Sequence, residues 1–183
     1  MKSYDLVRDA LVPMLSKSEI DEIKRIANEL PPNPTVIIIG AGVGAASLSI
    51  LEERQDVLIF SIDITFPVHQ EMYKPGERAN LVEAGYWETG RVIQVWGDSA
   101  IVGQHWPVKC DWLFIDGDHR YPAVRKDIDL WVRHVKDGGI VSLHDYAPKS
   151  KKPRAGVKEA VDESIGKELK QISLAHWLIS FRK

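Results

Sequence analysis

The stretch Val36-Ile-Ile-Ile-Gly40-Ala-Gly42-Val-Gly44 decides the fold class, because it joins a short apolar run directly to a glycine-rich turn. A continuous apolar run of this length is typical of a strand buried on both faces of a parallel sheet. The glycines allow a tight turn and let the backbone approach a ligand at the start of the next helix. The stretch therefore predicts a strand–turn–helix unit with a ligand site at the turn. A tight turn without a ligand is the alternative.

Further apolar runs along the chain predict four more strands of the same sheet, Val57–Ile62, Val92–Val95, Trp112–Ile115 and Ile140–Leu143. Helical patterns lie between strands at about 43–54, 77–86 and 120–135, and a last one follows at about 155–166. This alternation predicts a doubly wound α/β fold with right-handed crossovers. The tail from Glu168 to Arg182 alternates apolar and polar residues and predicts an antiparallel strand pair, which makes about seven strands.

The chain of 183 residues has the length of one domain, with two N-terminal helices over 1–34 and the α/β core over 35–183. We expect the second helix to begin at Ser18, with Glu19 in its first turn, where a carboxylate interacts favourably with the helix dipole. Pro31, Pro32 and Pro34 are expected to end it.

The composition limits the classes of partner. Twenty-four Lys and Arg against 26 Asp and Glu give a net charge of −2, which provides no overall field for nucleic acid or an anionic membrane. No apolar run approaches the roughly 20 residues of a membrane span. Cys110 is the only cysteine, so it cannot form an internal disulfide, which fits a reducing compartment. We therefore predict a cytoplasmic protein without membrane or nucleic-acid partners, and a homodimer stays open.

Two acidic positions predict a nucleotide-like ligand. Asp63 ends the second strand, at the place where an acid accepts hydrogen bonds from the ribose hydroxyls of an adenosine ligand; helix or turn capping is the alternative. Trp96-Gly-Asp98-Ser99-Ala100 follows the third strand and could place a carboxylate and a hydroxyl near an adenine amino group. Turn chemistry explains the same Gly-Asp-Ser sequence almost as well.

The most informative stretch is Asp111-Trp-Leu-Phe-Ile-Asp116-Gly-Asp118-His119-Arg120-Tyr121. A buried strand here delivers two carboxylates and an imidazole to the sheet edge where ligands bind in this architecture. His119, with an ordinary pKa of about 6.5, is expected to accept a proton, unless it is only a surface residue at a helix start. Asp118 could also serve only as a helix cap.

Together these motifs resemble the class I S-adenosylmethionine-dependent methyltransferases, especially the small branch related to the caffeoyl-CoA and catechol O-methyltransferases. The resemblance runs from Val36 to Leu143 and implies a Rossmann-like, mostly parallel sheet. It implies that the cofactor is S-adenosylmethionine, bound by Gly40, Ala41, Gly42, Gly44, Asp63, Ile64, Asp98, Ser99 and Asp116. Lys136-Asp-Gly138-Gly139-Ile140 resembles the turn entering strand five. Ile38 departs from the family, because many members have an acid there that supports the methionine end of the cofactor.

The resemblance also implies a cation site. In the metal-dependent branch an Asp after strand four and an Asp-Asn pair after strand five hold a divalent cation. Here Asp116 matches the first, and His144-Asp145 stand at the pair. Carboxylates suit magnesium, whereas an imidazole shifts the preference toward manganese, iron or zinc. The alternatives are that His144 and Asp145 orient the substrate or act as bases without a metal, or are inert.

The implied activity is transfer of a methyl group from S-adenosylmethionine to an oxygen or nitrogen of a small-molecule acceptor. The expected catalytic residues are Asp116, His119, His144 and Asp145. An NAD-dependent oxidoreductase and a non-catalytic adenosyl-cofactor-binding domain are the alternatives. We expect the long loop from Thr65 to Gly76 to act as a lid or binding element. The basic run Lys149–Arg154 is either a solvated loop or a guide for an anionic substrate.

Overall fold

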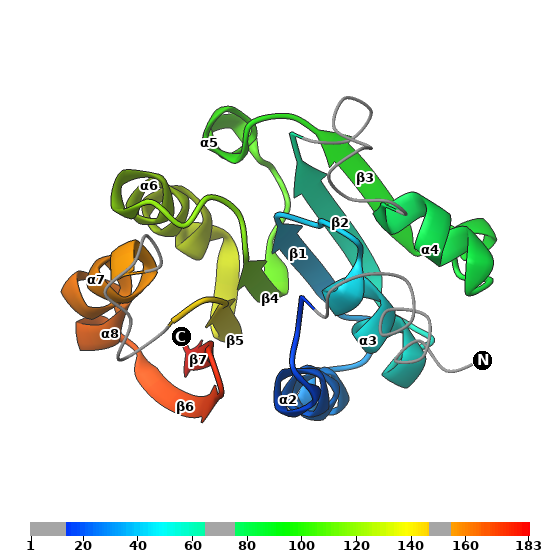
Figure 1. The fold of residues 1–183 in the computed structure, drawn as a ribbon, viewed down its shortest axis with the longest axis horizontal. Helices are drawn as coiled ribbons and strands as arrows, with labels where there is room; N and C mark the ends of the chain where they lie inside the picture. Colours follow the sequence, from blue (N-terminus) through cyan, green and yellow to red (C-terminus); the bar gives the residue numbers. More distant parts are fainter. Residues whose placement is uncertain (1–13, 65–75, 147–154) are drawn as a thin grey trace.

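The computed structural model describes residues 14–64, 76–146 and 155–183 (Figure 1). The first predicted helix, most of the loop from Thr65 to Gly76 and all of the basic run Lys149–Arg154 lie outside the described residues. The helices are α2 (Lys17–Glu29), α3 (Ala45–Glu53), α4 (Glu77–Glu83), α5 (Ser99–Val102), α6 (Tyr121–Trp131), α7 (Ala155–Glu163) and α8 (Ile165–Glu168). The strands are β1 (Thr35–Ile39), β2 (Leu58–Asp63), β3 (Val92–Trp96), β4 (Cys110–Ile115), β5 (Val135–Leu143), β6 (Lys170–Ala175) and β7 (Leu178–Arg182).

These strands form one seven-stranded sheet in the order β3-β2-β1-β4-β5-β7-β6. The first five are parallel, and β7 pairs antiparallel with both β5 and β6. The prediction of a doubly wound, mostly parallel sheet with an antiparallel C-terminal pair is confirmed. Because β1 pairs with both β2 and β4, the carboxyl ends of these central strands lie at one edge of the sheet.

Both faces of the central strands are buried, which explains the continuous apolar run Val36–Ile39 of β1. Val36 and Ile38 pack in one cluster with residues of α2 and α3. Ile37 and Ile39 point the other way and pack in a second cluster with residues of α6 and α7. Helices therefore cover the sheet on both sides (Figure 1). Burial of each such isoleucine side chain contributes about 1.5–3 kcal/mol to stability.

The pairing register fixes where functional side chains emerge. Ile39 pairs with Ile62 of β2 and with Ile115 of β4, and Ile115 pairs in turn with Leu143 of β5. The residues that follow these four positions therefore leave the sheet at the same level. They are Gly40, Asp63, Asp116 and His144.

Two predicted boundaries are wrong. The helix expected over 120–135 ends at Trp131, and β5 already begins at Val135. Lys136–Ile140, expected as a turn, belongs to this strand: Gly138 N–H donates to Lys183 O (2.8 Å) and Lys183 N–H donates to Gly139 O (3.0 Å). These two bonds hold the stretch against Lys183, although Gly138 keeps a left-handed φ of 78° where the register between β4 and β5 shifts.

Helix α2 also begins earlier than expected, because Ser16 and not Ser18 is its N-cap. The Ser16 hydroxyl accepts the Glu19 N–H, and the Glu19 carboxylate accepts the Ser16 N–H at 2.6 Å. This capping box sets the start of the helix. Among the described residues, no helix has the length and apolar character needed to cross a membrane.

Candidate active site

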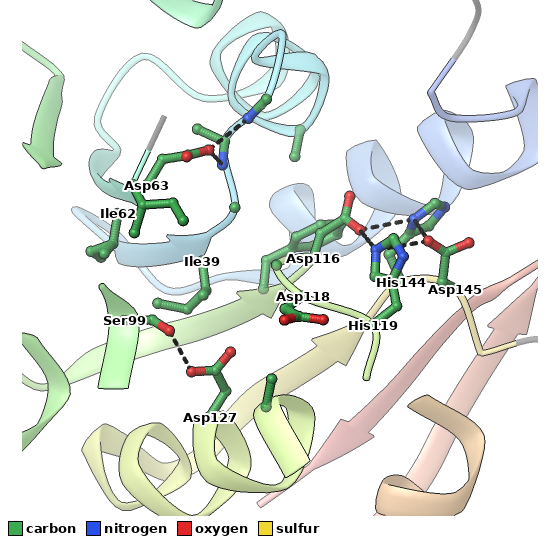
Figure 2. Close-up of a pocket in the computed structure, with 18 of the residues that line it drawn as sticks. Ile39, Ile62, Asp63, Ser99, Asp116, Asp118, His119, Asp127, His144 and Asp145 are labelled. Carbon is green, nitrogen blue, oxygen red and sulfur yellow. Dashed lines mark hydrogen bonds and ion pairs between the residues drawn. The ribbon is translucent and has the colours of Figure 1, made fainter. Parts of the chain in front are cut away.

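A cavity of about 1020 Å³ lies at the carboxyl edge of the parallel strands. Every predicted site residue except Gly44 lines it: Gly40, Ala41, Gly42, Asp63, Ile64, Asp98, Ser99, Asp116, His119, His144 and Asp145. Figure 2 shows Asp63 and Asp145 on opposite sides of this region, with Asp116 between them. The structure therefore brings the glycine turn and the Asp–His residues to one cavity.

Close backbone contacts explain two of the glycines in the turn. A Cβ atom on Gly40 (φ +81°) would overlap the carbonyl group of Asp116, so the turn packs directly against the end of β4. Gly44 (φ +82°) is the N-cap of α3, and a Cβ there would lie 2.8 Å from Cγ of Glu77. Gly44 thus faces α4 instead of the cavity and has a structural role.

The Asp63 carboxylate closes the glycine turn. Its Oδ2 accepts the N–H groups of Ala41 (2.9 Å) and Gly42 (3.1 Å) (Figure 2), and the residue is 8% exposed. The predicted ribose-binding acid is therefore at the cavity, and it also holds the turn in shape. This second role matches the turn capping that the sequence offered as the alternative for Asp63.

A buried carboxyl group lies near the position where Ile38 replaces the usual acid of the family. Glu77 at the start of α4 accepts hydrogen bonds from Ser47 (2.5 Å), Ser61 (2.8 Å) and Gln94 (2.8 Å). Ser61 is the β2 residue that pairs with Ile38. Burial raises the pKa of Glu77, and its three donors oppose that shift. Glu77 N–H donates to Gly42 O at 3.1 Å and so supports the turn, but Glu77 is not among the residues that line the cavity.

Asp98 and Ser99, at the predicted adenine side of the cavity, each form a hydrogen bond within the protein. Asp98 is the N-cap of α5 and its Oδ1 accepts the Ala100 N–H at 2.7 Å. The Ser99 hydroxyl donates to Oδ1 of Asp127 at 2.6 Å (Figure 2). Asp127 is 3% exposed and lines the cavity, and burial raises its pKa to about 6. Sequence reasoning missed Asp127, although an acid between Val124 and Ile128 on the apolar face of α6 is a usable signal.

Four residues form a cluster of alternating carboxylates and imidazoles. His144 Nδ1 lies 3.1 Å from Oδ1 of Asp116 and 3.7 Å from Oδ2 of Asp145. His119 Nε2 lies 3.0 Å from that same Asp145 oxygen and 3.6 Å from Oδ1 of Asp116. Figure 2 shows the two rings side by side with the carboxylates around them. We refer to these four residues as the Asp–His cluster.

The backbone of Asp145 adopts a left-handed conformation, with φ of 59°. The peptides on both sides hold it there: His144 N–H donates to Ile115 O (3.0 Å), and Tyr146 N–H donates to Trp177 O (2.9 Å). A non-glycine residue in this region costs about 1–2 kcal/mol and persists only where the surroundings impose it. The backbone contacts at the end of β5 therefore fix the Asp145 carboxylate at the cavity, where the residue is 3% exposed.

Glu19 is the functional candidate that sequence reasoning missed most clearly. It was assigned to the helix dipole, but it is 2% exposed and its Oε1 lies 3.1 Å from His144 Nε2. The same oxygen accepts the Trp177 N–H at 3.0 Å. Burial would raise the pKa of Glu19, but hydrogen bonds from His144 and Ser16 lower it to about 2.

The carboxylates change the protonation of both histidines. Hydrogen bonds to Asp116 and then Asp145 raise the pKa of His119 to about 9, so the expected ordinary value near 6.5 is wrong for this environment. Burial alone would lower the pKa of His144, but Asp116 and Glu19 outweigh it and raise the pKa to about 10. In this structure both imidazoles are therefore protonated at neutral pH.

The donor set fits a divalent cation. Asp116, His144 and Asp145 each offer one ligand atom, and these atoms lie within 4.8 Å of one another. Two carboxylate oxygens and one imidazole nitrogen suit manganese, iron or zinc better than a site of oxygens alone would, and magnesium remains compatible with the carboxylates.

Fold and site together define a class I methyltransferase-like α/β domain. The chain belongs to the methyltransferase domain family, whose sequence profile matches residues 37–146, so the resemblance seen in the sequence is confirmed. Neither the oxidoreductase alternative nor the non-catalytic one receives support from this match.

Solved structures show the same fold. A candidate caffeoyl-CoA O-methyltransferase from Staphylococcus aureus is 18% identical with a TM-score of 0.71, covering 98% of this chain and 89% of that one. An O-methyltransferase from Bacillus cereus, solved with SAH, is 12% identical with a TM-score of 0.73 and covers 100% and 90%. An uncharacterised protein of Acanthamoeba polyphaga mimivirus is 45% identical over 40 residues, which is 22% of this chain and only 18% of that protein.

Proposed function

We propose that this protein transfers the methyl group of S-adenosylmethionine to an oxygen or nitrogen atom of a small-molecule acceptor. The observation that supports this best is that one cavity contains both the glycine turn and the Asp–His cluster. Cofactor and acceptor could then share one space, with the reacting atoms held close together. Membership of the methyltransferase domain family supports the same reaction.

The cofactor is expected to bind along the turn and the end of β2. Asp63 offers a carboxylate to the ribose hydroxyls, as charge-assisted hydrogen bonds. Ile64, next to it, is 58% exposed and offers an apolar surface to the adenine ring. Ser99 and Asp98 lie farther along the same cavity, at the expected adenine side.

The sulfonium methyl group is already activated, so the chain's own task is to position the acceptor, exclude water and take up a proton. We assign proton uptake to His119, which is about one-third exposed at the cavity and bonded to Asp145. Its raised pKa makes it a strong base that retains the proton once transferred. In the free protein this imidazole is protonated at neutral pH, so the role requires that it lose that proton before the acceptor reacts.

Asp116, His144 and Asp145 are the residues that would hold a divalent cation. When bound, such a cation supplies Lewis-acid chemistry, which lowers the pKa of an acceptor hydroxyl. Structural relatives described as O-methyltransferases favour an oxygen acceptor over nitrogen.

Label transfer tests this proposal. The protein is incubated with methyl-labelled S-adenosylmethionine and a panel of phenols, catechols and amines, with and without Mn²⁺, and both the labelled acceptor and the release of S-adenosylhomocysteine are followed by mass spectrometry. We expect release that depends on the acceptor and is strongest for a hydroxylated one. Cofactor binding without transfer to any acceptor of the panel would favour the non-catalytic alternative, and absence of cofactor binding would contradict the proposal.

A further inference from the structure

The ring of His144 is held at both nitrogens by carboxylates from distant parts of the chain. Nδ1 lies 3.1 Å from Oδ1 of Asp116, and Nε2 lies 3.1 Å from Oε1 of Glu19. His144 is 7% exposed and Glu19 is 2% exposed, so water does not compete for these contacts. The Glu19 carboxylate is therefore a fixed hydrogen-bond partner of His144.

Glu19 is itself fixed from three directions. Its Oε2 accepts the Ser16 N–H at 2.6 Å, and its Oε1 accepts the Trp177 N–H at 3.0 Å in addition to the contact with His144. Ser16 belongs to the cap of α2, and Trp177 lies in the turn between β6 and β7. The Glu19 oxygen is thus placed before any ligand binds, which lowers the cost of orienting the ring.

This contact determines which nitrogen of His144 can bind a cation. Glu19 already accepts two backbone N–H groups, from Ser16 and Trp177, so its carboxylate faces His144 as a hydrogen-bond acceptor and the nitrogen that faces it, Nε2, carries the hydrogen. Nδ1 is then the nitrogen that can ligate. It faces an oxygen of Asp116 at 3.1 Å and one of Asp145 at 3.7 Å, and these two residues offer the other ligand atoms of the cation site.

We infer that Glu19 is a positioning residue that fixes His144 as an Nδ1 ligand of the divalent cation. The inference rests on the cation site of the proposed function. A carboxylate behind a ligating histidine fixes its tautomer and raises its basicity, and loss of such a partner lowers metal affinity about 10–100-fold. Helix α2, which precedes the sheet, therefore contributes to a site whose ligands all come from the ends of β4 and β5.

Manganese binding tests the inference without an acceptor. Free Mn²⁺ is measured by electron paramagnetic resonance during titration of the wild type, Glu19→Ala, Glu19→Gln and Asp21→Ala. Asp21→Ala is the matched control, because it removes an exposed carboxylate of the same helix that pairs with Lys17 and leaves the Glu19–His144 contact in place. We expect about 10–100-fold weaker binding for Glu19→Ala, a smaller loss for Glu19→Gln and wild-type affinity for Asp21→Ala.

The tautomer of His144 shows whether Glu19 positions this ring or only stabilises the fold. In ¹⁵N-histidine-labelled protein loaded with Zn²⁺, long-range ¹H–¹⁵N spectra should show His144 with the metal on Nδ1 and a hydrogen on Nε2. Metal on Nε2, or equal Mn²⁺ affinity in wild type and Glu19→Ala, would overturn the inference.

Titration of S-adenosylhomocysteine into the same samples distinguishes this failure from failure of the proposed function. A wild type that binds S-adenosylhomocysteine but no Mn²⁺ overturns both the cation site and the role of Glu19, and leaves methyl transfer standing. Unchanged cofactor affinity in Glu19→Ala, together with lost Mn²⁺ binding, supports the inference.

Discussion

Oδ2 of Asp145 lies 3.0 Å from Nε2 of His119, so the end of β5 and the loop after β4 meet at a carboxylate–imidazole pair. Asp145 is buried and held in a left-handed backbone conformation, whereas His119 is about one-third exposed at the cavity. The pair thus combines a rigid carboxylate with an accessible imidazole. This is the arrangement that a proton acceptor and its orienting group require.

His119→Ala is expected to lower the rate of methyl transfer about 10²–10⁴-fold, because it removes the proton acceptor. Affinity for S-adenosylmethionine should be preserved. Single-turnover rates with saturating cofactor and the acceptor found by label transfer provide the measurement. His105→Ala, an exposed histidine away from the cavity, is the control. A loss below about threefold would remove His119 from the mechanism.

Asp63→Ala should weaken S-adenosylmethionine binding by about 1.5–3 kcal/mol through loss of charge-assisted hydrogen bonds to the ribose. Because Asp63 also accepts two N–H groups of the turn, the variant should be less stable than the wild type as well. Asp63→Asn keeps an acceptor oxygen for the turn and should retain more stability. Titration calorimetry and thermal unfolding measure the two effects, and an unchanged affinity in both variants would contradict ribose binding.

Asp145→Gly should abolish Mn²⁺ binding and remove the backbone strain at this position. Glycine adopts a φ of 59° without the penalty that Asp145 bears, whereas Asp145→Ala retains that penalty. The glycine variant should therefore be about 1 kcal/mol more stable than the alanine variant, as measured by urea unfolding. Retained Mn²⁺ affinity in both variants would show that Asp145 is not a ligand.

Asp127 should make stability fall as pH rises from about 4 to 6. Its pKa is near 3.8 in the unfolded chain and about 6 in the fold, so over this interval the folded state binds more protons than the unfolded one. The corresponding loss is about 3 kcal/mol. This loss of stability is absent below the pKa of Asp127 in the unfolded chain and complete above its pKa in the folded protein.

Asp127→Asn should remove that loss, so the variant's stability relative to the wild type should increase between pH 4 and pH 7. Urea unfolding at several pH values measures the difference. Asp129→Asn, on the outer face of the same helix, should leave the pH dependence unchanged. Parallel curves for the wild type and Asp127→Asn would show that the fold does not raise the pKa of Asp127.

The sequence predicts well what depends on local patterns. The strand at Val36–Ile39 and the glycine turn after it follow from continuous apolar residues and glycine spacing. The ends of successive parallel strands meet at one edge, which is why Asp63, Asp116 and His144 could be assigned to one cavity.

Contacts between distant segments were not predictable in this way. Glu19 and His144 are 125 positions apart, and nothing near either residue indicates the other. Asp127 is hidden in the pattern of an amphipathic helix, and the early start of β5 depends on the pairing of Val135 with Cys110 and of Gly138 and Gly139 with Lys183. Each of these features depends on packing between elements, which periodicity does not encode.

The most direct test of the central claim is a crystal structure of this protein grown with S-adenosylhomocysteine. We predict density in the cavity, with the ribose hydroxyls at the Asp63 carboxylate, the adenine beside Ile64 and Ser99, and the sulfur directed toward Asp116 and His119. A ligand bound elsewhere, or an empty cavity at a concentration that saturates calorimetric binding, would contradict the assignment of this cavity as a methyltransferase active site.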